Sequence, residues 1–281
     1  MSAGSGTPTL VGLVGHPVAG NPTGTMMEAA FARAGLDWRY VSMDVERGDL
    51  EAAVAGLAAL GFRGFNVTMP YKVEILPLLA RLSPAVELIG AANTVVREGD
   101  GWVGENTDGK GFLAAVAEAL EPRGARVWLI GAGGAARAVA AELALAGAAS
   151  IEIVNRDGGR GRSIAEMLTA RTATRAAWRP WASPLVVEPG VDLVVNATSL
   201  GYNDPDAGLD LDLRRAAHPL VADVVFDPPR TKLLRQAEAA GCRTLDGLGM
   251  LANQGAIAFR LWTGVEPDRD VMRAVLSGGR P

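Results

Sequence analysis

The segment RVWLIGAGGAA, residues 126–136, decides the fold of the second half of this 281-residue chain. Its apolar run over 127–130 predicts a buried strand, and a glycine turn follows without a spacer. Gly131 permits a tight turn, Gly133 lets the backbone approach a pyrophosphate, and Ala136 is small enough for the next helix to pack closely. Free N–H groups at that helix N-terminus attract anions. The predicted contacts to the phosphates of a dinucleotide are Gly131, Ala132, Gly133, Gly134 and Ala135.

Downstream residues extend this segment into a Rossmann-type unit. The helix is expected to reach about Ala146 and to end at Gly147, a typical C-terminal position for glycine. Short apolar strands are expected over 151–154, 193–196 and 220–225. Their spacing predicts a parallel sheet with helices on its faces.

The first half of the chain alternates in the same way. Strands are predicted over 10–14, 38–44 and 64–68, and helices over 25–34 and 50–60. This pattern predicts a second layered α/β domain with a mostly parallel sheet. Beyond Leu245 the pattern turns helical, and nothing there predicts another sheet.

Length and composition restrict the class of protein. At roughly 150 residues per domain the chain predicts two domains, and 49% apolar with 21% charged residues indicates packed cores. A net charge of −4 disfavours nucleic-acid binding. The single cysteine, Cys242, cannot form an internal disulfide, and two histidines make a zinc site unexpected. Neither a membrane span nor a secretory signal is predicted, so a cytoplasmic protein is expected.

The choice of dinucleotide depends on the end of the second strand after the glycine turn, where NAD enzymes usually carry an acid for the ribose. This chain has Asn155 and Arg156 there, followed by Asp157 and Arg160. A planar guanidinium at Arg156 suits a 2′-phosphate, which favours NADP. NAD stays an alternative, because Asp157 would repel a phosphate if it pointed inward.

Three polar blocks interrupt the first half: NVTMPYK at 66–72, GAANT at 90–94 and GENTDG at 104–109. Taken singly, their charged residues have ordinary explanations. Lys72 can be explained as a solvated surface lysine, and Asp108 as the cap of a helix that begins near Gly111. Residue type alone therefore gives weak support for a catalytic pair.

With these blocks, NATSLG at 196–201 and GMLANQ at 249–254, the chain resembles the shikimate dehydrogenase family, which includes quinate dehydrogenases. Five blocks match in family order, and the resemblance covers about Leu10 to Gly264. It implies an α/β substrate domain of residues 1–108 and 246–281. A Rossmann NADP-binding domain of residues 109–245 would lie between, and the C-terminal helices would pack back on the first domain.

The resemblance also implies an activity and its residues. The expected reaction is the reversible NADP-dependent reduction of 3-dehydroshikimate to shikimate, in the biosynthesis of chorismate and aromatic amino acids. Lys72 would transfer the proton, as base or as electrostatic stabiliser, and Asp108 would orient the reacting hydroxyl. The family's other positions map to Thr68, Asn93 and Gln254 for the substrate, and to Asn196, Thr198, Ser199 and Gly247 for the cofactor.

The sequence departs from the family where the substrate carboxylate binds. The family has a Ser-x-Ser pair preceded by histidine, whereas this chain has Asn21, Pro22 and Thr23 preceded by Gly20. Asn21 and Thr23 still offer two donors for a carboxylate. The other departures are Met27 and Glu28 for a His-Asn pair, Phe226 for a tyrosine, and Tyr202 for a methionine. Such changes in donors can redirect specificity.

These departures leave alternatives open. One is the same chemistry on quinate or on an amino-substituted shikimate, with NAD or NADP. Another is a tetrahydrofolate dehydrogenase/cyclohydrolase, which is disfavoured because Thr68 stands where that family has tyrosine. A non-catalytic dinucleotide-binding regulator is disfavoured by the joint presence of Lys72, Asp108, Asn93 and Gln254. Monomer and homodimer are both compatible with the sequence.

Overall fold

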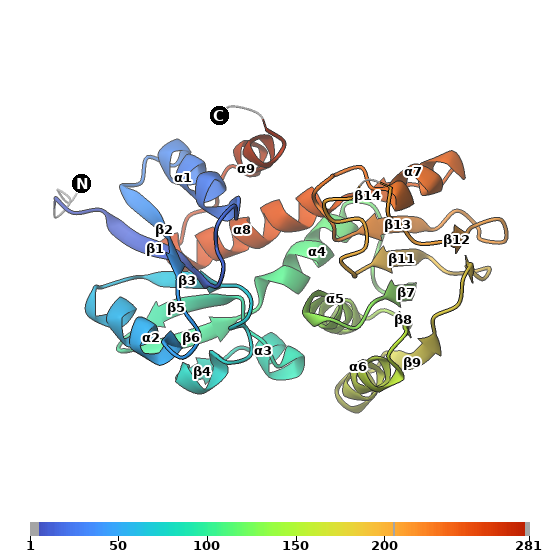
Figure 1. The fold of residues 1–281 in the computed structure, drawn as a ribbon, viewed down its shortest axis with the longest axis horizontal. Helices are drawn as coiled ribbons and strands as arrows, with labels where there is room; N and C mark the ends of the chain where they lie inside the picture. Colours follow the sequence, from blue (N-terminus) through green and yellow to red (C-terminus); the bar gives the residue numbers. More distant parts are fainter. Residues whose placement is uncertain (1–5, 205, 279–281) are drawn as a thin grey trace. The chain divides into compact units, whose positions relative to one another are not determined.

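The computed structural model describes residues 6–204 and 206–278 and divides into two compact units (Figure 1). One unit comprises the chain up to Thr107 together with the chain from Gly255, and the other is Asp108–Gln254. Both boundaries fall inside helices, α4 (Thr107–Ala117) and α8 (Gly247–Thr263). That the first unit binds the substrate and the second binds NADP stays a prediction.

The first unit is built on a six-stranded sheet in the order β2-β1-β3-β5-β6-β4. Strands β1, β2 and β3 are parallel neighbours, as their alternation with helices predicts. Strands β5 and β6 were not predicted, and they run antiparallel because only two residues, Gly99 and Asp100, connect them. The sheet is therefore mixed. The strands are β1 Thr9–Gly15, β2 Trp38–Asp44, β3 Gly64–Val67, β4 Arg81–Leu82, β5 Thr94–Glu98 and β6 Gly101–Glu105.

Helices cover both faces of this sheet, and Figure 1 shows α1 and α9 side by side on one of them. The C-terminal residues pack on this unit, as predicted. Phe259 of α8 stacks on Phe31 of α1 at 5.1 Å between ring centroids, and the Trp262 indole donates to the Val95 carbonyl at 3.0 Å. The helical segments are α1 Thr23–Arg33, α2 Leu50–Ala59, η1 Leu76–Leu78, α3 Pro84–Ile89 and α9 Arg269–Leu276.

The second unit holds a wholly parallel six-stranded sheet in the order β14-β13-β11-β7-β8-β9, the predicted Rossmann-type arrangement. A separate two-stranded sheet pairs β10 with β12. The strands are β7 Arg126–Ile130, β8 Ser150–Asn155, β9 Arg175–Pro180, β10 Leu185–Val186, β11 Leu193–Asn196, β12 Leu211–Asp212, β13 Leu220–Asp223 and β14 Thr244–Leu245. The remaining helices are α5 Gly134–Leu145, α6 Gly158–Arg171 and α7 Lys232–Ala239.

Alternate side chains of β7 enter two separate cores. Val127 and Leu129 lie in the cluster beneath α5 and α6, whereas Trp128 and Ile130 lie in the cluster with α7 and β10. A strand with both faces buried explains the unbroken apolar run in the sequence.

Helix α4 begins earlier than expected. The interpretation of Asp108 as a helix cap requires a helix that begins near Gly111. The first residue of α4 is Thr107, four positions before Gly111, so Asp108 lies in the first turn. The Thr107 N–H donates to the side-chain oxygen of Asn93 at 2.7 Å, which satisfies one otherwise unpaired helix donor. The interpretation of Asp108 as the cap of a later helix is therefore wrong.

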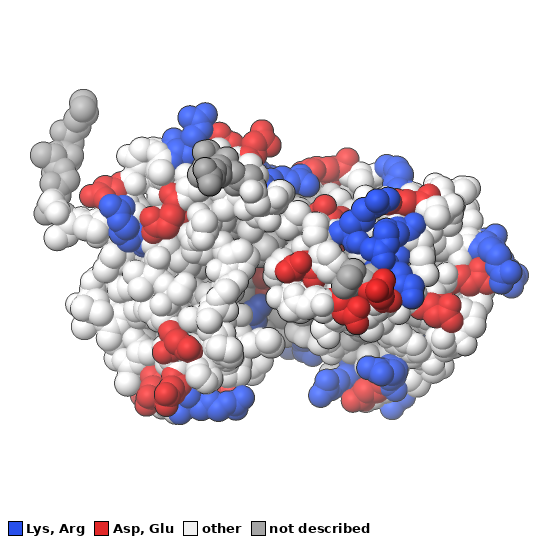
Figure 2. All heavy atoms as spheres, turned by 45° about the horizontal axis from the view of Figure 1, so that its top comes forward, with Lys and Arg blue, Asp and Glu red and all other residues white. Residues whose placement is uncertain are grey.

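The surface carries both signs of charge. On the face shown in Figure 2, groups of basic side chains lie next to acidic ones. Among the residues that the structure describes, no helix is long and apolar enough to cross a membrane.

Candidate functional site

The glycine turn joins β7 to α5 in the second unit. Gly131 has φ +118°, and its N–H donates to the Val154 carbonyl at 2.9 Å. A Cβ at this position would lie 2.7 Å from the Ala197 carbonyl oxygen. Gly133 caps α5 without a side-chain hydrogen bond, so the first N–H groups of the helix are left for an anion. The backbone thus has the form of a phosphate-binding turn.

The predicted cofactor residues from other strands gather at the same edge, because the carboxyl ends of neighbouring parallel strands meet there. A cavity of about 340 Å³ is lined by Asn155 at the end of β8, by Arg156 after it, and by Thr198 and Ser199 after β11. A second cavity, of about 470 Å³, is lined by Ala132, Gly133, Gly134, Arg137 and Arg160. Eight of the twelve predicted cofactor residues therefore line these two cavities.

The carboxylate of Asp157 is occupied by helix α6. Its Oδ1 accepts from the Gly159 and Arg160 N–H groups at 2.8 and 3.1 Å, and the Arg160 side chain lies 3.5 Å from Oδ2. Asp157 lines neither cavity. The sequence kept NAD as an alternative because Asp157 could repel a 2′-phosphate. In the structure the negative charge of Asp157 is offset by the N-terminus of α6 and by the neighbouring Arg160.

Gly247 begins α8 against the backbone that follows β13. A Cβ here would lie 2.5 Å from the Val225 carbonyl oxygen, so only glycine allows this approach. This contact explains the glycine structurally, and its predicted contact with the cofactor stays a prediction.

Asp223 is a buried carboxylate that the sequence reasoning missed. It accepts hydrogen bonds from the Asn196 side-chain amide at 2.9 Å, from the Val225 N–H at 3.0 Å and from the Thr231 hydroxyl at 2.7 Å. Asn196 in turn accepts from the Thr198 N–H and hydroxyl at 3.1 and 2.7 Å. Asp223 therefore fixes the loop that carries three predicted cofactor residues. An acidic residue at the end of an apolar strand was the available signal.

Stability should depend on the titration of Asp223. Burial raises its pKa to about 6 despite the three hydrogen bonds. A raised carboxyl pKa gives stability that is present below the unfolded pKa and is lost as pH rises through the folded one. Relative to Asp223→Asn, the wild-type free energy of unfolding should fall by about 2 kcal/mol from pH 4 to pH 7. Denaturant titrations of both proteins measure this difference, and parallel pH profiles would contradict it.

In the first unit, Thr68, Lys72 and Asn93 lie at one edge of the sheet. The Thr68 N–H donates to the Val14 carbonyl at 2.9 Å, the Val67 N–H to the Asn93 carbonyl at 2.8 Å, and the Ala92 N–H to the Lys72 carbonyl at 2.8 Å. Lys72 is half-buried in the turn after β3. The structure therefore brings three of the predicted substrate and catalytic residues together on rigid backbone.

A buried polar network supports this edge. The Tyr40 hydroxyl donates to Asn66 at 2.8 Å, and the Asn66 amide donates to the Thr94 hydroxyl at 3.0 Å and to the Asn93 carbonyl at 3.2 Å. Burial raises the pKa of Tyr40 far above its usual range, so it stays a neutral donor. The network holds Asn93, whose side chain also bonds Thr107. Tyr40 and Asn66 were not predicted as site residues, although Asn66 is the first residue of the polar block at 66–72.

The segment that replaces the family's Ser-x-Ser has its own geometry. Asn21 Oδ1 accepts from the Thr23 N–H at 3.0 Å, at the start of α1. That oxygen is committed to the helix, so the amide nitrogen of Asn21 is the group it can offer a ligand. Thr23 is buried, and Met27 is fully buried in the core. Glu28 accepts a hydrogen bond from the Tyr40 N–H.

Asp108 and Gln254 belong to the second unit, on α4 and α8. The two helices approach closely, because a Cβ at Gly111 would lie 2.6 Å from the Gln254 backbone nitrogen. Gln254 is buried and Asp108 half-buried. Lys72 is in the other unit, so its predicted pairing with Asp108 stays a prediction.

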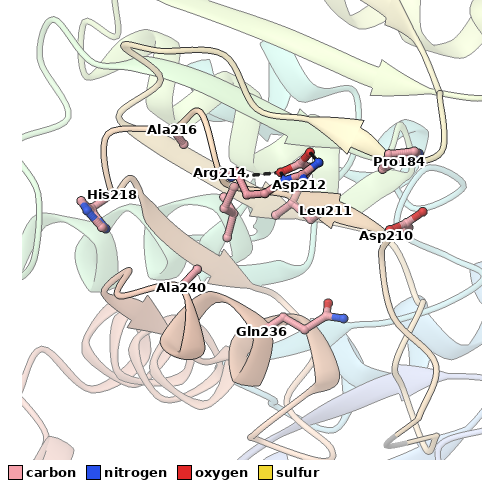
Figure 3. Close-up of a pocket in the computed structure, with 10 residues that line it drawn as sticks. Pro184, Asp210, Leu211, Asp212, Arg214, Ala216, His218, Gln236 and Ala240 are labelled. Atoms are coloured by element: carbon pink, nitrogen blue, oxygen red, sulfur yellow. Dashed lines mark hydrogen bonds and ion pairs between the residues drawn. The ribbon is translucent and has the colours of Figure 1, made fainter.

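Another cavity, of about 610 Å³, lies by β12 and α7 (Figure 3). Its Arg214 forms two hydrogen bonds to Asp212, at 2.9 and 2.6 Å, and these lower the pKa of Asp212 to about 2. The cation is neutralised by its own neighbour. No residue of the glycine turn lines this cavity, and we do not include it in the candidate site.

A parallel sheet with a glycine turn, together with a second α/β unit that carries a lysine among polar residues, is typical of nicotinamide-dependent oxidoreductases. Three family models match the chain: the shikimate dehydrogenase substrate binding domain over residues 13–95, shikimate/quinate 5-dehydrogenase over 115–199, and the shikimate 5'-dehydrogenase C-terminal domain over 247–276. The chain belongs to the shikimate dehydrogenase family.

Individual relatives cover nearly the whole chain. Shikimate dehydrogenase (NADP(+)) of Citrifermentans bemidjiense is 46% identical over 97% of this chain and 96% of its own. The ligand-free 5-ketofructose reductase of Gluconobacter sp. is 43% identical with a TM-score of 0.95, over 96% of this chain and 98% of its own. Shikimate 5-dehydrogenase of Listeria monocytogenes, in complex with shikimate and NAD, is 34% identical with a TM-score of 0.89, over 98% of both chains.

Proposed function

We propose that the chain is an NADP-dependent dehydrogenase that reversibly reduces 3-dehydroshikimate to shikimate. The observation that carries this proposal is the 46% identity, over nearly the full length, to a shikimate dehydrogenase (NADP(+)). The retained blocks around Lys72, Asn93, Asp108 and Gln254 support it, since these positions carry the family's substrate and catalytic roles.

The residues at the sheet edge of the second unit fit the cofactor. The turn over 131–135 supplies backbone N–H groups for the pyrophosphate. No atom lies within 4 Å of the position that a Cβ would take at Gly133, which leaves space beside the turn. Arg156 and Arg160 would hold the 2′-phosphate. When bound, NADP accepts or delivers the hydride at the substrate ring carbon.

Lys72 would transfer the proton of the reacting hydroxyl, and Asp108 would assist it. In the direction of oxidation, the substrate O–H proton passes to Lys72 Nζ while the ring carbon loses its hydride, and reduction reverses both transfers. Asp108 would accept a hydrogen bond from the hydroxyl and so orient it. Thr68, Asn93 and Gln254 would bind the remaining hydroxyls, and Asn196, Thr198 and Ser199 would line the nicotinamide side.

A second candidate is the reduction of a neutral polyhydroxylated ketone of the 5-ketofructose type. Two observations favour it: the 43% identity and TM-score of 0.95 with a 5-ketofructose reductase, and the Asn21–Thr23 geometry. Asn21 Oδ1 accepts from the Thr23 N–H, so the start of α1 fixes the orientation of the Asn21 amide, and an NH2 group stands where the family has a serine hydroxyl. Such an NH2 group can donate to a neutral hydroxyl or carbonyl oxygen as well as to a carboxylate.

Steady-state assays distinguish these functions. We expect oxidation of shikimate with NADP, and weaker oxidation with NAD or of quinate. Turnover of 5-ketofructose with NADPH, together with no turnover of shikimate, would overturn the first candidate and support the second. The double variant Asn21→Ser with Thr23→Ser is the matched control, because it restores the family's donors and should lower KM only for substrates with a carboxylate.

A further inference from the structure

Trp181, which follows β9, lies beside Arg156. The Arg156 Cζ atom is 5.7 Å from the centroid of the indole ring, within the roughly 6 Å reach of a cation–π contact. The indole is half-buried and packs against a core cluster that includes Leu185 and Leu209. An anchored ring thus supports an exposed arginine.

Arg156 differs from Arg160 and Arg179, which both lie close to carboxylates. Arg160 has a carboxylate at 3.5 Å, and Arg179 bonds Glu152 and Glu188 at 2.6 and 2.9 Å. Within residues 6–204 and 206–278 no ion pair involves Arg156. Its guanidinium therefore keeps its charge and its hydrogen-bond donors for a ligand.

An unsupported arginine on the surface would lose rotamer entropy when a ligand fixes it. The indole contact reduces this cost by holding the guanidinium before binding. Trp181 and Arg156 line the same cavity of about 340 Å³, together with Asn155 at the end of β8. This is the strand end at which a Rossmann-type unit holds the adenosine ribose.

We infer that Trp181 is a positioning residue that holds Arg156 for the 2′-phosphate and so sets the preference for NADP over NAD. This inference rests on the proposed NADP-dependent function. Because Trp181 acts through Arg156, it should strengthen binding of the 2′-phosphate and leave binding of the parts that NAD shares with NADP unchanged.

Isothermal titration of the full-length chain with NADP+ and with NAD+, without substrate, tests this inference. Trp181→Leu keeps an apolar contact with the core but loses the aromatic face, and Trp181→Phe keeps an aromatic face. We expect Trp181→Leu to raise the Kd for NADP+ about fivefold and that for NAD+ less than twofold. Trp181→Phe should stay within about twofold of the wild type for both.

A double-mutant cycle with Arg156→Ala provides the decisive comparison. Arg156→Ala should raise the Kd for NADP+ at least tenfold, and adding Trp181→Leu should then have no further effect. Equal losses of NADP+ and NAD+ affinity in Trp181→Leu would overturn the inference, since they would indicate direct contact with adenine or a damaged fold. A wild-type chain that binds both dinucleotides equally would refute the proposed cofactor itself, whereas failure of the shikimate assay alone would leave this binding result intact.

Discussion

Replacing Lys72 by alanine should lower kcat for shikimate oxidation by about a thousandfold, within the 10²–10⁴ range of general acid–base groups. The lysine lies in the turn after β3, where the Ala92 N–H fixes its carbonyl at 2.8 Å. The side chain is thereby presented from rigid backbone, and its removal should leave that backbone in place. The measurement is steady-state kcat, with the Kd for NADP+ measured by titration.

Two comparisons make this prediction specific. The Kd for NADP+ should stay within about twofold of the wild type, because the predicted dinucleotide residues belong to the other unit. Lys232→Ala, on α7, removes the same side chain elsewhere and should keep full activity. If Lys72→Ala retained most of its kcat, Lys72 would have no part in proton transfer.

Gly131→Ala should both weaken the fold and abolish tight binding of NADP+. The residue has φ +118°, which side chains rarely adopt, and a Cβ would lie 2.7 Å from the Ala197 carbonyl oxygen. Backbone strain and overpacking each cost about 1–3 kcal/mol. We expect a loss of about 2–4 kcal/mol in the free energy of unfolding, and a Kd for NADP+ raised more than a hundredfold.

Gly133→Ala is the matched control for this glycine turn. Gly133 has a negative φ of −85°, and no atom lies within 4 Å of the position its Cβ would take. The fold should therefore tolerate alanine to within about 0.5 kcal/mol, while the methyl group crowds the pyrophosphate and weakens NADP+ binding. Equal stability losses in the two variants would show that the turn is governed by something other than these contacts.

The elements that could be predicted are those whose signals are local. Strand β7 reads as four apolar residues before a glycine turn, and it occupies Arg126–Ile130 as predicted. Strands β2 and β11 also occupy the expected residues. In contrast, β9 lies at the edge of the sheet, and its side chains are exposed or half-buried rather than buried. Its sequence, RAAWRP, contains two arginines and a proline and has no apolar run that would predict a strand.

The candidate site divides in the same way. The glycine turn, Asn155 and Asn196 could be placed from sequence, because each follows a recognisable strand and parallel strands end together. The role of Asp157 as the cap of α6 was missed, although its bonds to the Gly159 and Arg160 N–H groups are local. Trp181 could not be placed from sequence, because its contact with Arg156 joins segments from the ends of two strands.

The sequence by itself determined the alternation of strands and helices, the phosphate-binding turn and the polar blocks of the family, because hydrophobic period and glycine position act over a few residues. Only the tertiary structure decided that the buried carboxylate of Asp223, at the end of β13, accepts from the Asn196 amide and the Thr231 hydroxyl. It also decided that the indole of Trp181 lies beside Arg156. The direction of a polar side chain depends on which donors distant segments bring within about 3 Å of it, and no local pattern records that.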